Sequence, residues 1–148
     1  MIIRTANLED QMQITDCVNK AYEPYIERIG KKPAPMLDDY NTSIKNKHVY
    51  VADDGEIVVG IIVLIPQKDH MHLGNLAVLP SKQNKGIGGQ LIKFGERLAA
   101  SAGYQQLRLF TNELMHENIT IYKKYGYSEI DRKTEDGYNR VFFVKVIK

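Results

Sequence analysis

The chain has 148 residues, of which 43% are hydrophobic and 26% are charged, and its formal net charge is +2. This length suffices for one domain with a hydrophobic core, and the composition is ordinary for a globular protein. The small net charge offers no case for nucleic-acid binding, and no apolar run approaches the roughly 20 residues of a membrane span. Cys17 is the single cysteine, which excludes an internal disulfide and argues against a structural zinc site.

The first third of the chain predicts one strand and two helices. Residues 1–5 read as a short strand and are too few and too mixed for a signal peptide, so we expect a cytoplasmic protein. A helix should begin near Asn7, a good N-cap residue, and bend or end at Pro24. Residues 30–35 contain two prolines and a glycine and predict a loop, which a short helix over 36–44 should follow.

The rest of the chain alternates between strand and helix patterns. The expected elements are strands over 48–52, 57–65 and 70–79, a helix with the core stripe Leu91, Phe94, Leu98 and Ala102, a strand over 106–111, a helix over 118–125, and a hairpin of 128–133 with 138–147. The second of these strands is almost continuously apolar, as in a strand buried on both faces. This mixed order predicts an α/β domain with a largely antiparallel sheet and one parallel pair at a helix crossover.

A glycine-rich loop links the strand over 70–79 to the next helix. Residues 83–89 read Gln-Asn-Lys-Gly-Ile-Gly-Gly. A turn of this kind at a helix start points several backbone N–H groups at one place and predicts phosphate binding, with Gly86 and Gly88 permitting positive φ and removing Cβ atoms. The loop lacks the Gly-Lys-Ser/Thr end of a P-loop and the third glycine of a dinucleotide fingerprint. The alternative is a glycine-rich turn that only caps the helix.

Two motifs resemble those of the Gcn5-related N-acetyltransferases, the GNAT superfamily. Gln-x-x-Gly-x-Gly after a Leu-x-Val strand end is similar to the coenzyme A loop of that family. Residues 118–127 resemble its helix that runs from an asparagine to an aromatic–glycine–aromatic end, at the family's separation from the loop. The element order of the whole chain is also similar. The resemblance implies one N-acetyltransferase domain over 1–148, with an α/β fold: a mixed, largely antiparallel sheet with a parallel splayed strand pair and helices on both faces.

The resemblance implies acetyl-CoA as co-substrate and no metal. In the family the strand before the loop bulges and splays, and its backbone pairs with the pantetheine arm. Those positions are Leu76, Ala77 and Val78 here, with the Leu76 N–H as donor to the acetyl carbonyl. Asn118 would hydrogen-bond the coenzyme, cap its own helix, or do both. The cofactor-binding residues expected in the loop are Gln83, Asn84, Lys85, Gly86, Ile87, Gly88 and Gly89.

Tyr122 matches the tyrosine that serves as general acid in many family members. A phenol with a pKa near 10 can protonate a departing thiolate once both are desolvated. Tyr125 lies where the family more often has an apolar residue, so the choice between the two tyrosines stays open. The alternative for Tyr122 is a packed core aromatic.

His72 is the candidate base, because some family members have a glutamate four residues before the position of Leu76. An imidazole with a pKa near 6.5 could take the proton of an amine. A half-exposed strand histidine and a base-free water chain remain alternatives. Period-two alternation places two sets of residues on opposite faces of this strand: His70, His72 and Gly74, against Met71, Leu73 and Asn75.

By the same resemblance, the acceptor enters opposite the coenzyme, over the first helices and the final hairpin. Tyr25, Asp38 and Tyr40 flank the proline-rich loop there and predict a cleft of negative potential for an ammonium group, the alternative being a solvated helical surface. We therefore expect transfer of an acetyl group from acetyl-CoA to a primary amine of a small molecule or peptide by direct attack in a ternary complex. The alternatives are a non-catalytic coenzyme A-binding sensor or regulatory domain, and a nucleotide-binding module. No nucleic-acid or membrane partner is expected, and both a monomer and a homodimer stay open.

Overall fold

The structure is a computed structural model, which describes residues 1–147. Three 3-10 turns lie at Leu8–Asp10, Ala34–Leu37 and Pro80–Lys82. The helices are α1 (Gln11–Tyr22), α2 (Pro24–Ile29), α3 (Tyr40–Lys45), α4 (Ile87–Ser101) and α5 (His116–Lys124). The strands are β1 (Ile2–Thr5), β2 (Val49–Asp53), β3 (Val58–Pro66), β4 (Met71–Val78), β5 (Gln106–Asn112), β6 (Ser128–Glu135) and β7 (Tyr138–Val146).

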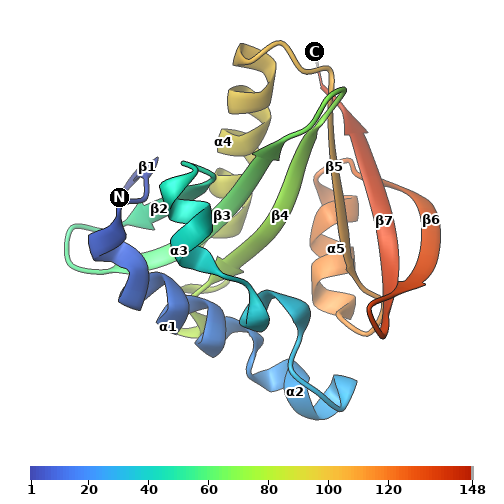
Figure 1. Ribbon diagram of the computed structural model, residues 1–148, viewed down its shortest axis with the longest axis horizontal. Helices are drawn as coiled ribbons and strands as arrows, with labels where there is room; N and C mark the ends of the chain where they lie inside the picture. Colours follow the sequence, from blue (N-terminus) through green and yellow to red (C-terminus); the bar gives the residue numbers. More distant parts are fainter. Residues whose placement is uncertain (148) are drawn as a thin grey trace.

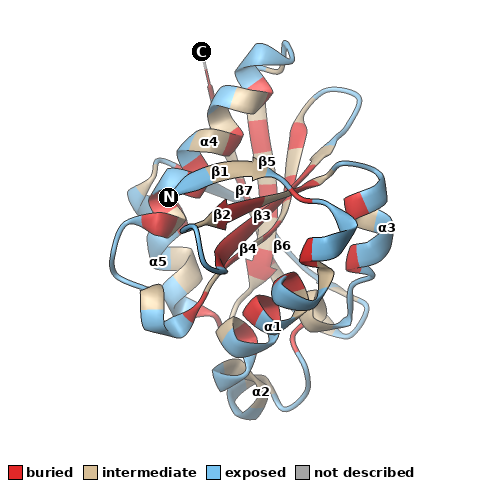
Figure 2. Ribbon diagram, turned by 90° about the vertical axis from the view of Figure 1, so that its left-hand side faces the viewer, coloured by how far each residue is buried: buried red, intermediate tan, exposed pale blue. Residues whose placement is uncertain are grey.

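The strands form one seven-stranded sheet in the order β1-β2-β3-β4-β5-β7-β6. Every neighbouring pair is antiparallel except β4 and β5, which run parallel. Helices α1 and α3 cover one face of the sheet, and α4 and α5 cover the other (Figures 1 and 2). The predicted fold class is therefore confirmed. No helix within residues 1–147 combines the length and the apolar character that crossing a membrane requires.

Strand β3 is buried on both faces because a helix packs on each side of it. On the α4 face, Gly95 lets the side chains of Ile62 and Leu64 approach to 3.3 and 3.1 Å from the place a Cβ atom would take. The buried residues of α4 are Ile87, Gly89, Leu91, Ile92, Gly95 and Ala99. Of the predicted core stripe, Leu91 is buried, Phe94 and Leu98 are half-buried, and Ala102 is exposed, so the buried face of α4 lies to one side of the predicted one.

Strands β4 and β5 pair only at one end. Met71 lies opposite Leu107 and His72 opposite Arg108, and no further pair joins the two strands within the described residues. Beyond this point the strands diverge, as Figure 1 shows between β4 and β5. The antiparallel neighbours stay together, so the sheet divides into a half that ends at β4 and a half that begins at β5. The parallel, splayed strand pair implied by the sequence is present.

A β-bulge interrupts β4 at the point where the strands part. The register between β3 and β4 skips Gly74, so Asn75 lies opposite Val63 while Leu73 lies opposite the next residue of β3. Residues directly opposite each other in antiparallel strands share a face. The extra residue therefore brings Asn75 to the same face as His72. The period-two prediction that put these two residues on opposite faces is wrong, because it assumed an unbroken strand.

Two predicted helices differ from the observed ones. The helix expected over 36–44 is split, because the Asp39 side chain accepts hydrogen bonds from the N–H and the hydroxyl of Thr42 and starts α3 there. Helix α5 begins at His116, before Asn118. Asn118 is therefore inside the first turn, and its alternative role as N-cap is excluded.

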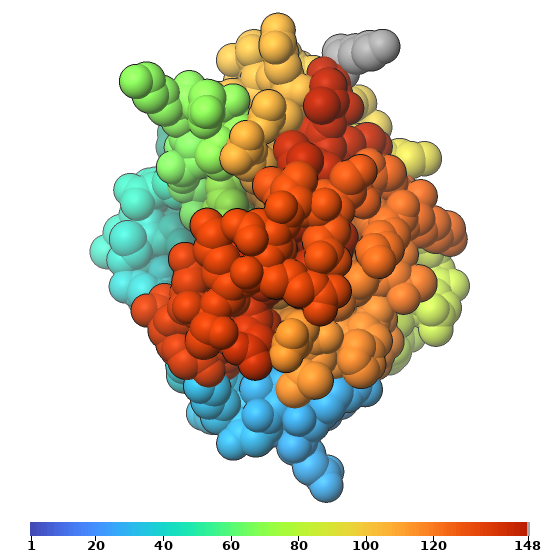
Figure 3. Space-filling model, turned by 90° about the vertical axis from the view of Figure 1, so that its right-hand side faces the viewer, coloured from blue at the N-terminus to red at the C-terminus, as the bar shows by residue number. Residues whose placement is uncertain are grey.

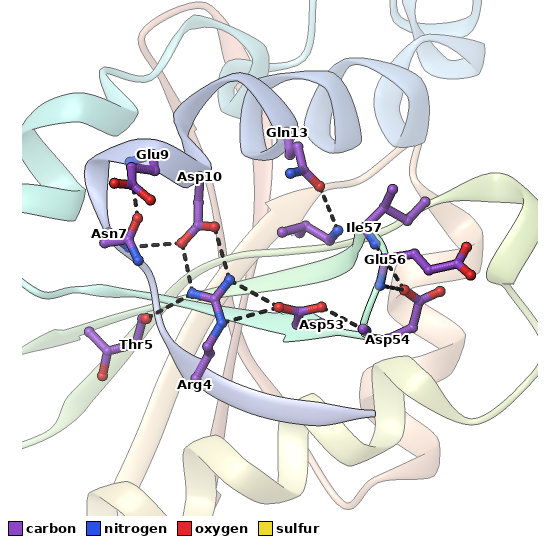
Figure 4. Close-up of polar contacts among 12 residues, drawn as sticks. Arg4, Thr5, Asn7, Glu9, Asp10, Gln13, Asp53, Asp54, Glu56 and Ile57 are labelled. Atoms are coloured by element: carbon purple, nitrogen blue, oxygen red, sulfur yellow. Dashed lines mark hydrogen bonds and ion pairs between the residues drawn. The ribbon is translucent and has the colours of Figure 1, made fainter.

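Arg4 anchors the edge strand β1. Its Nη1 and Nη2 atoms donate to the two carboxylate oxygens of Asp10 at 2.8 and 2.9 Å, and Nη2 also donates to Asp53 at 3.1 Å (Figure 4). Asp10 is 6% exposed, and hydrogen bonding to this guanidinium holds the pKa of its carboxyl below the usual range. Asn7 caps the first turn, as predicted, and its N–H donates to Asp10. The start of α1 is thereby tied to β1 and β2.

The chain after α2 meets the β6–β7 hairpin, as the blue and orange-red surfaces of Figure 3 show. The Lys31 ammonium donates to the carbonyl of Gly137 at 2.7 Å, and the Tyr138 hydroxyl donates to the carbonyl of Lys32 at 2.6 Å. Arg28 forms an ion pair of 2.8 Å with the first turn of α5. The two halves of the molecule thus touch again beyond the open end of the strand pair.

Candidate active site

The gap between β4 and β5 contains a cavity of about 120 Å³. Its lining comes from both halves of the sheet, from α1 and α5, and from the loop before α3. The lining includes Tyr22, Pro35, Asp38, Asn75, Leu76, Phe110, Asn118, Tyr122 and Arg140. Among residues 1–147, no three His, Cys, Asp or Glu side chains are grouped so as to hold a metal ion.

The edge of β4 presents backbone groups to this gap. The carbonyl of Leu76 accepts a hydrogen bond of 2.9 Å from the Tyr22 hydroxyl, and that of Val78 accepts one of 3.1 Å from the Gln83 amide. The carbonyl of Ala77 lies on the opposite side, toward β3. The N–H and C=O of one strand residue share an edge, so the N–H groups of Leu76 and Val78 also face the gap. An extended ligand could pair with this edge as a strand would.

The glycine loop delivers the N-terminus of α4 to the same end of β4. Gly86 has φ +82° and stands at the N-cap, and Asn84 has φ +63°. The first N–H groups of an α-helix lack intrahelical partners and favour an anion. The predicted positive φ is wrong for Gly88, which lies in the helical first turn of α4. A Cβ atom there would meet only Val78 within 4 Å, at 3.8 Å, so the space beside Gly88 is open.

The other loop residues differ in exposure. Gln83, Asn84 and Lys85 are exposed, whereas Ile87 and Gly89 are buried against the core. The polar residues of the loop are therefore accessible to a ligand by their side chains. Ile87 and Gly89 could contact a ligand only through their backbone groups.

The two tyrosines of α5 point in different directions. Tyr122 lines the cavity and is 5% exposed, and burial raises the pKa of its hydroxyl well above the usual value. Its ring packs on Tyr127 and Phe143. Tyr125 instead packs on α4 so closely that a Cβ atom at Gly89 would overlap its hydroxyl. Of the two candidates, Tyr122 faces the cleft.

A buried chain of hydrogen bonds connects β4 with the loop before α3. The Tyr22 hydroxyl lies within hydrogen-bond distance of both the Asn75 side-chain oxygen and the carbonyl of Leu76. The Asn75 amide donates to the Tyr40 hydroxyl at 2.7 Å, and that hydroxyl donates to the carbonyl of Pro35 at 2.6 Å. We call this the Tyr22–Asn75–Tyr40 chain. It fixes Leu76 and Pro35, which both line the cavity, relative to one another.

His72 lies at the closed end of the gap, opposite Arg108 in the last β4–β5 pair. The centre of its ring is 5.4 Å from that of Phe110. Burial, with a smaller contribution from His70, lowers the pKa of His72 to about 4. The imidazole is therefore neutral near pH 7 but a weaker base than a free histidine. His72 is not among the residues that line the cavity.

The three acceptor residues predicted from the sequence take different positions. Asp38 lines the cavity at its exposed rim, where the surrounding protein raises the pKa of its carboxyl. Tyr40 is 6% exposed, and its hydroxyl is engaged in the buried chain. Tyr25 packs on α1 beneath the guanidinium of Arg28, outside the cavity lining. Asp38 is the one of the three that a ligand in this cavity would meet.

The sequence reasoning missed Arg140, the basic residue that β7 contributes to the cavity. The lining holds one acidic and one basic side chain, Asp38 and Arg140, so the predicted acidic residues are not the only charges at the cavity. The expectation that the final hairpin borders the acceptor could have pointed to Arg140. Tyr22 and Asn75 were also missed, since their contact joins positions 53 residues apart.

The fold of this chain, with its sheet split between β4 and β5 and the glycine loop at the start of α4, matches solved acetyltransferases. The crystal structure of aminoglycoside 6'-acetyltransferase type Ii matches with a TM-score of 0.79 and 25% identity, over 100% of this chain and 98% of that one. An aminoglycoside 6'-N-acetyltransferase complexed with coenzyme A matches in fold with a TM-score of 0.75 and 20% identity, over 100% and 98%.

The chain belongs to the GNAT acetyltransferase family, because the model of the acetyltransferase (GNAT) domain matches residues 45–129. Among curated proteins, the chain is similar to probable N-acetyltransferase family 8 member 5 of Mus musculus, with 26% identity over 78% of this chain and 54% of that protein. N-acetyltransferase 8F1 of Rattus norvegicus is 25% identical over 86% of this chain and 62% of that protein. The chain spans little more than half the length of these two relatives.

Proposed function

We propose that this protein transfers an acetyl group from acetyl-CoA to a primary amine, in a complex that holds both substrates at once. The observation that carries the proposal is the edge of β4 beside the N-terminus of α4, where Leu76 and Val78 turn their backbone groups away from β3 and their carbonyls accept side-chain hydrogen bonds. The structural relative with a bound coenzyme A and the N-acetyltransferase names of the curated relatives support it.

The residues present fit acetyl-CoA in three places. The first N–H groups of α4 and the loop 83–89 suit the pyrophosphate, with Lys85 supplying positive charge. The β4 edge suits the amides of the pantetheine arm. Asn118 lies one helical turn before Tyr122 and lines the same cavity, where it can hydrogen-bond the arm.

Leu76 and Tyr122 carry the charge changes of the transfer. The amine nitrogen first bonds to the carbonyl carbon, and the Leu76 N–H would stabilise the negative charge that this addition places on the carbonyl oxygen. The carbon–sulfur bond then breaks as the carbonyl re-forms. Tyr122 would give its proton to the departing thiolate and regain one from the water that receives the proton of the amine. Burial raises the pKa of this phenol and makes it a weaker acid, but the same apolar surroundings also disfavour the thiolate that forms beside it, so the proton transfer does not leave a charge where none was before.

The proton lost by the amine needs an acceptor, and the sequence offered His72 or a water chain. We propose the water chain, because His72 lies at the closed end of the gap and its pKa is about 4. Water bound to the Tyr22–Asn75–Tyr40 chain would lie nearer the cavity, since Tyr22 and Asn75 line it.

Calorimetric titration with acetyl-CoA tests the proposal. Gly88→Val adds a branched side chain beside β4, where a Cβ atom meets no protein atom nearer than 3.8 Å, so the variant should melt close to the wild type yet lose measurable affinity. Ala100→Val, an exposed change near the other end of α4, is the matched control and should bind normally. Unchanged affinity in folded Gly88→Val would remove the loop from the binding site.

A panel of amines, with thiol release as the readout, separates catalysis from binding alone. Acetyl-CoA binding without transfer to any amine would favour the coenzyme A-binding sensor. Stabilisation by ATP but not by acetyl-CoA in a thermal melt would favour the nucleotide-binding module.

A further inference from the structure

The charges inside the cleft are few and opposite. Among the residues that line the cavity, Asp38 is the one acidic side chain and Arg140 the one basic side chain. They form no ion pair with each other within the described residues. Burial raises the pKa of Asp38, and the positive charge of Arg140 offsets part of this rise. The cavity therefore holds one carboxylate and one guanidinium at separate places, among largely apolar walls.

The guanidinium of Arg140 is held in place with donors to spare. Its side chain is 12% exposed, and its central carbon lies 4.3 Å from the ring centre of Phe110. The polar contacts to Glu135 at 3.2 Å and Asp136 at 3.6 Å both use Nη1. Within residues 1–147 no hydrogen bond of Nε or Nη2 is found. These two atoms form one edge of the guanidinium, which is the edge that binds a carboxylate with two parallel hydrogen bonds.

The Arg140 side chain is ordered by the protein itself, without a ligand. The Phe110 ring and the carboxylates of Glu135 and Asp136 restrict the Arg140 side chain, so binding a ligand costs it little further conformational entropy. A cationic acceptor would bring its charge toward Arg140 and be repelled. An acceptor with a carboxylate near its amine would place the carboxylate on Arg140 and its ammonium group toward Asp38.

We propose that Arg140 determines acceptor specificity by binding a carboxylate, so that the acceptor is an amino acid or a close derivative with a free carboxylate. This inference rests on the acetyl transfer proposed above and names the class of its acceptor. The apolar part of the lining, which includes Phe110, suits an apolar side chain on that acceptor.

Three acceptors of one shape test this inference: leucine, leucinamide and 3-methylbutylamine, which lacks the carboxylate. The measurement is kcat/KM for thiol release in the wild type, Arg140→Gln, Arg140→Lys and the control Arg132→Gln. Arg132 lies on β6 with a 56% exposed side chain outside the cavity. Comparing the leucine-to-leucinamide ratio between enzymes cancels the different basicities of the two amines.

The wild type should prefer leucine, and Arg140→Gln should lower the leucine-to-leucinamide ratio about tenfold or more, as loss of a charge-assisted hydrogen-bonded pair predicts. Arg140→Lys keeps the charge without the fork and should give an intermediate ratio, while Arg132→Gln keeps the wild-type ratio. Acetyl-CoA affinity should be the same in all four proteins. If Arg140→Gln does not fold, the wild-type preference and Arg140→Lys still decide.

Two other results have separate meanings. The carboxylate site is overturned if the wild type acetylates 3-methylbutylamine or the polycation spermidine as well as leucine or better, and if Arg140→Gln keeps the wild-type leucine-to-leucinamide ratio. That result leaves the proposed acetyl transfer intact. Acetyl-CoA binding without transfer to any of the four amines overturns the proposed function itself.

Discussion

Replacing Tyr40 by phenylalanine should destabilise the protein far more than the loss of one oxygen atom suggests. The Tyr40 hydroxyl accepts from the Asn75 amide and donates to the carbonyl of Pro35. Asn75 is 4% exposed, so the variant leaves a buried donor without its partner. An unpaired buried polar group costs about 1–3 kcal/mol, which lowers Tm by about 3–9 °C in a chain of this length.

Tyr50→Phe is the matched control for this measurement. The Tyr50 ring packs on Phe94 at 5.1 Å between centres, but no hydrogen bond of its hydroxyl is found within residues 1–147. Its loss should change the free energy of unfolding by less than about 0.5 kcal/mol. Urea unfolding followed by circular dichroism gives both values. Equal stabilities of Tyr40→Phe and Tyr50→Phe would refute the structural role of the Tyr22–Asn75–Tyr40 chain.

Four further predictions concern catalysis and stability. Tyr122→Phe should lower kcat about ten- to a thousandfold in steady-state kinetics with little change in KM, because a general acid acts in the transition state; a larger defect in Tyr125→Phe would reverse the assignment. His72→Gln should keep the wild-type pH–rate profile near neutrality, and loss of its acidic limb would restore His72 as the base. Gly89→Ala should lower Tm by several degrees, unlike Gly88→Val, since its Cβ atom overlaps Tyr125. The pKa of Asp10 is lower in the folded than in the unfolded state, so its contribution to stability is present above about pH 4 and is lost as the pH falls further. Asp10→Asn should therefore lower Tm near neutral pH, and the Tm of this variant should decrease less than that of the wild type as the solution is acidified.

The features predicted well depend on residues that are close together in the sequence. The glycine loop was recognised from seven consecutive residues. The burial of the strand over 57–65 was predicted from its continuous apolar run. Asn7 caps its turn through contacts with residues two and three positions away. Local patterns of this kind are set by backbone geometry and survive whatever the rest of the chain does.

The features missed depend on distant parts of the chain. The resemblance implied a bulge in this strand, but its position at Gly74 depends on the register between β3 and β4, which the sequence of β4 alone does not fix. Arg140 reaches the cleft only because β7 lies beside β5. Tyr22 gains its partners through the packing of α1 on β4. Contacts between distant positions cannot be read from a single sequence, so the glycine loop and its place at the start of α4 could be predicted, but the residues that line the far side of the cavity could not.

The short pairing of β4 with β5 also bears on how the molecule opens. Two residue pairs join these strands, whereas seven join β5 to β7, so the seam between the halves has the fewest backbone hydrogen bonds to break. Amide hydrogens along this seam should exchange with solvent through local opening, well before the centre of either half. A ligand lying along β4 would add its own hydrogen bonds to the seam and slow that exchange. The substrate would then act as a missing strand that stiffens the sheet for as long as it stays bound.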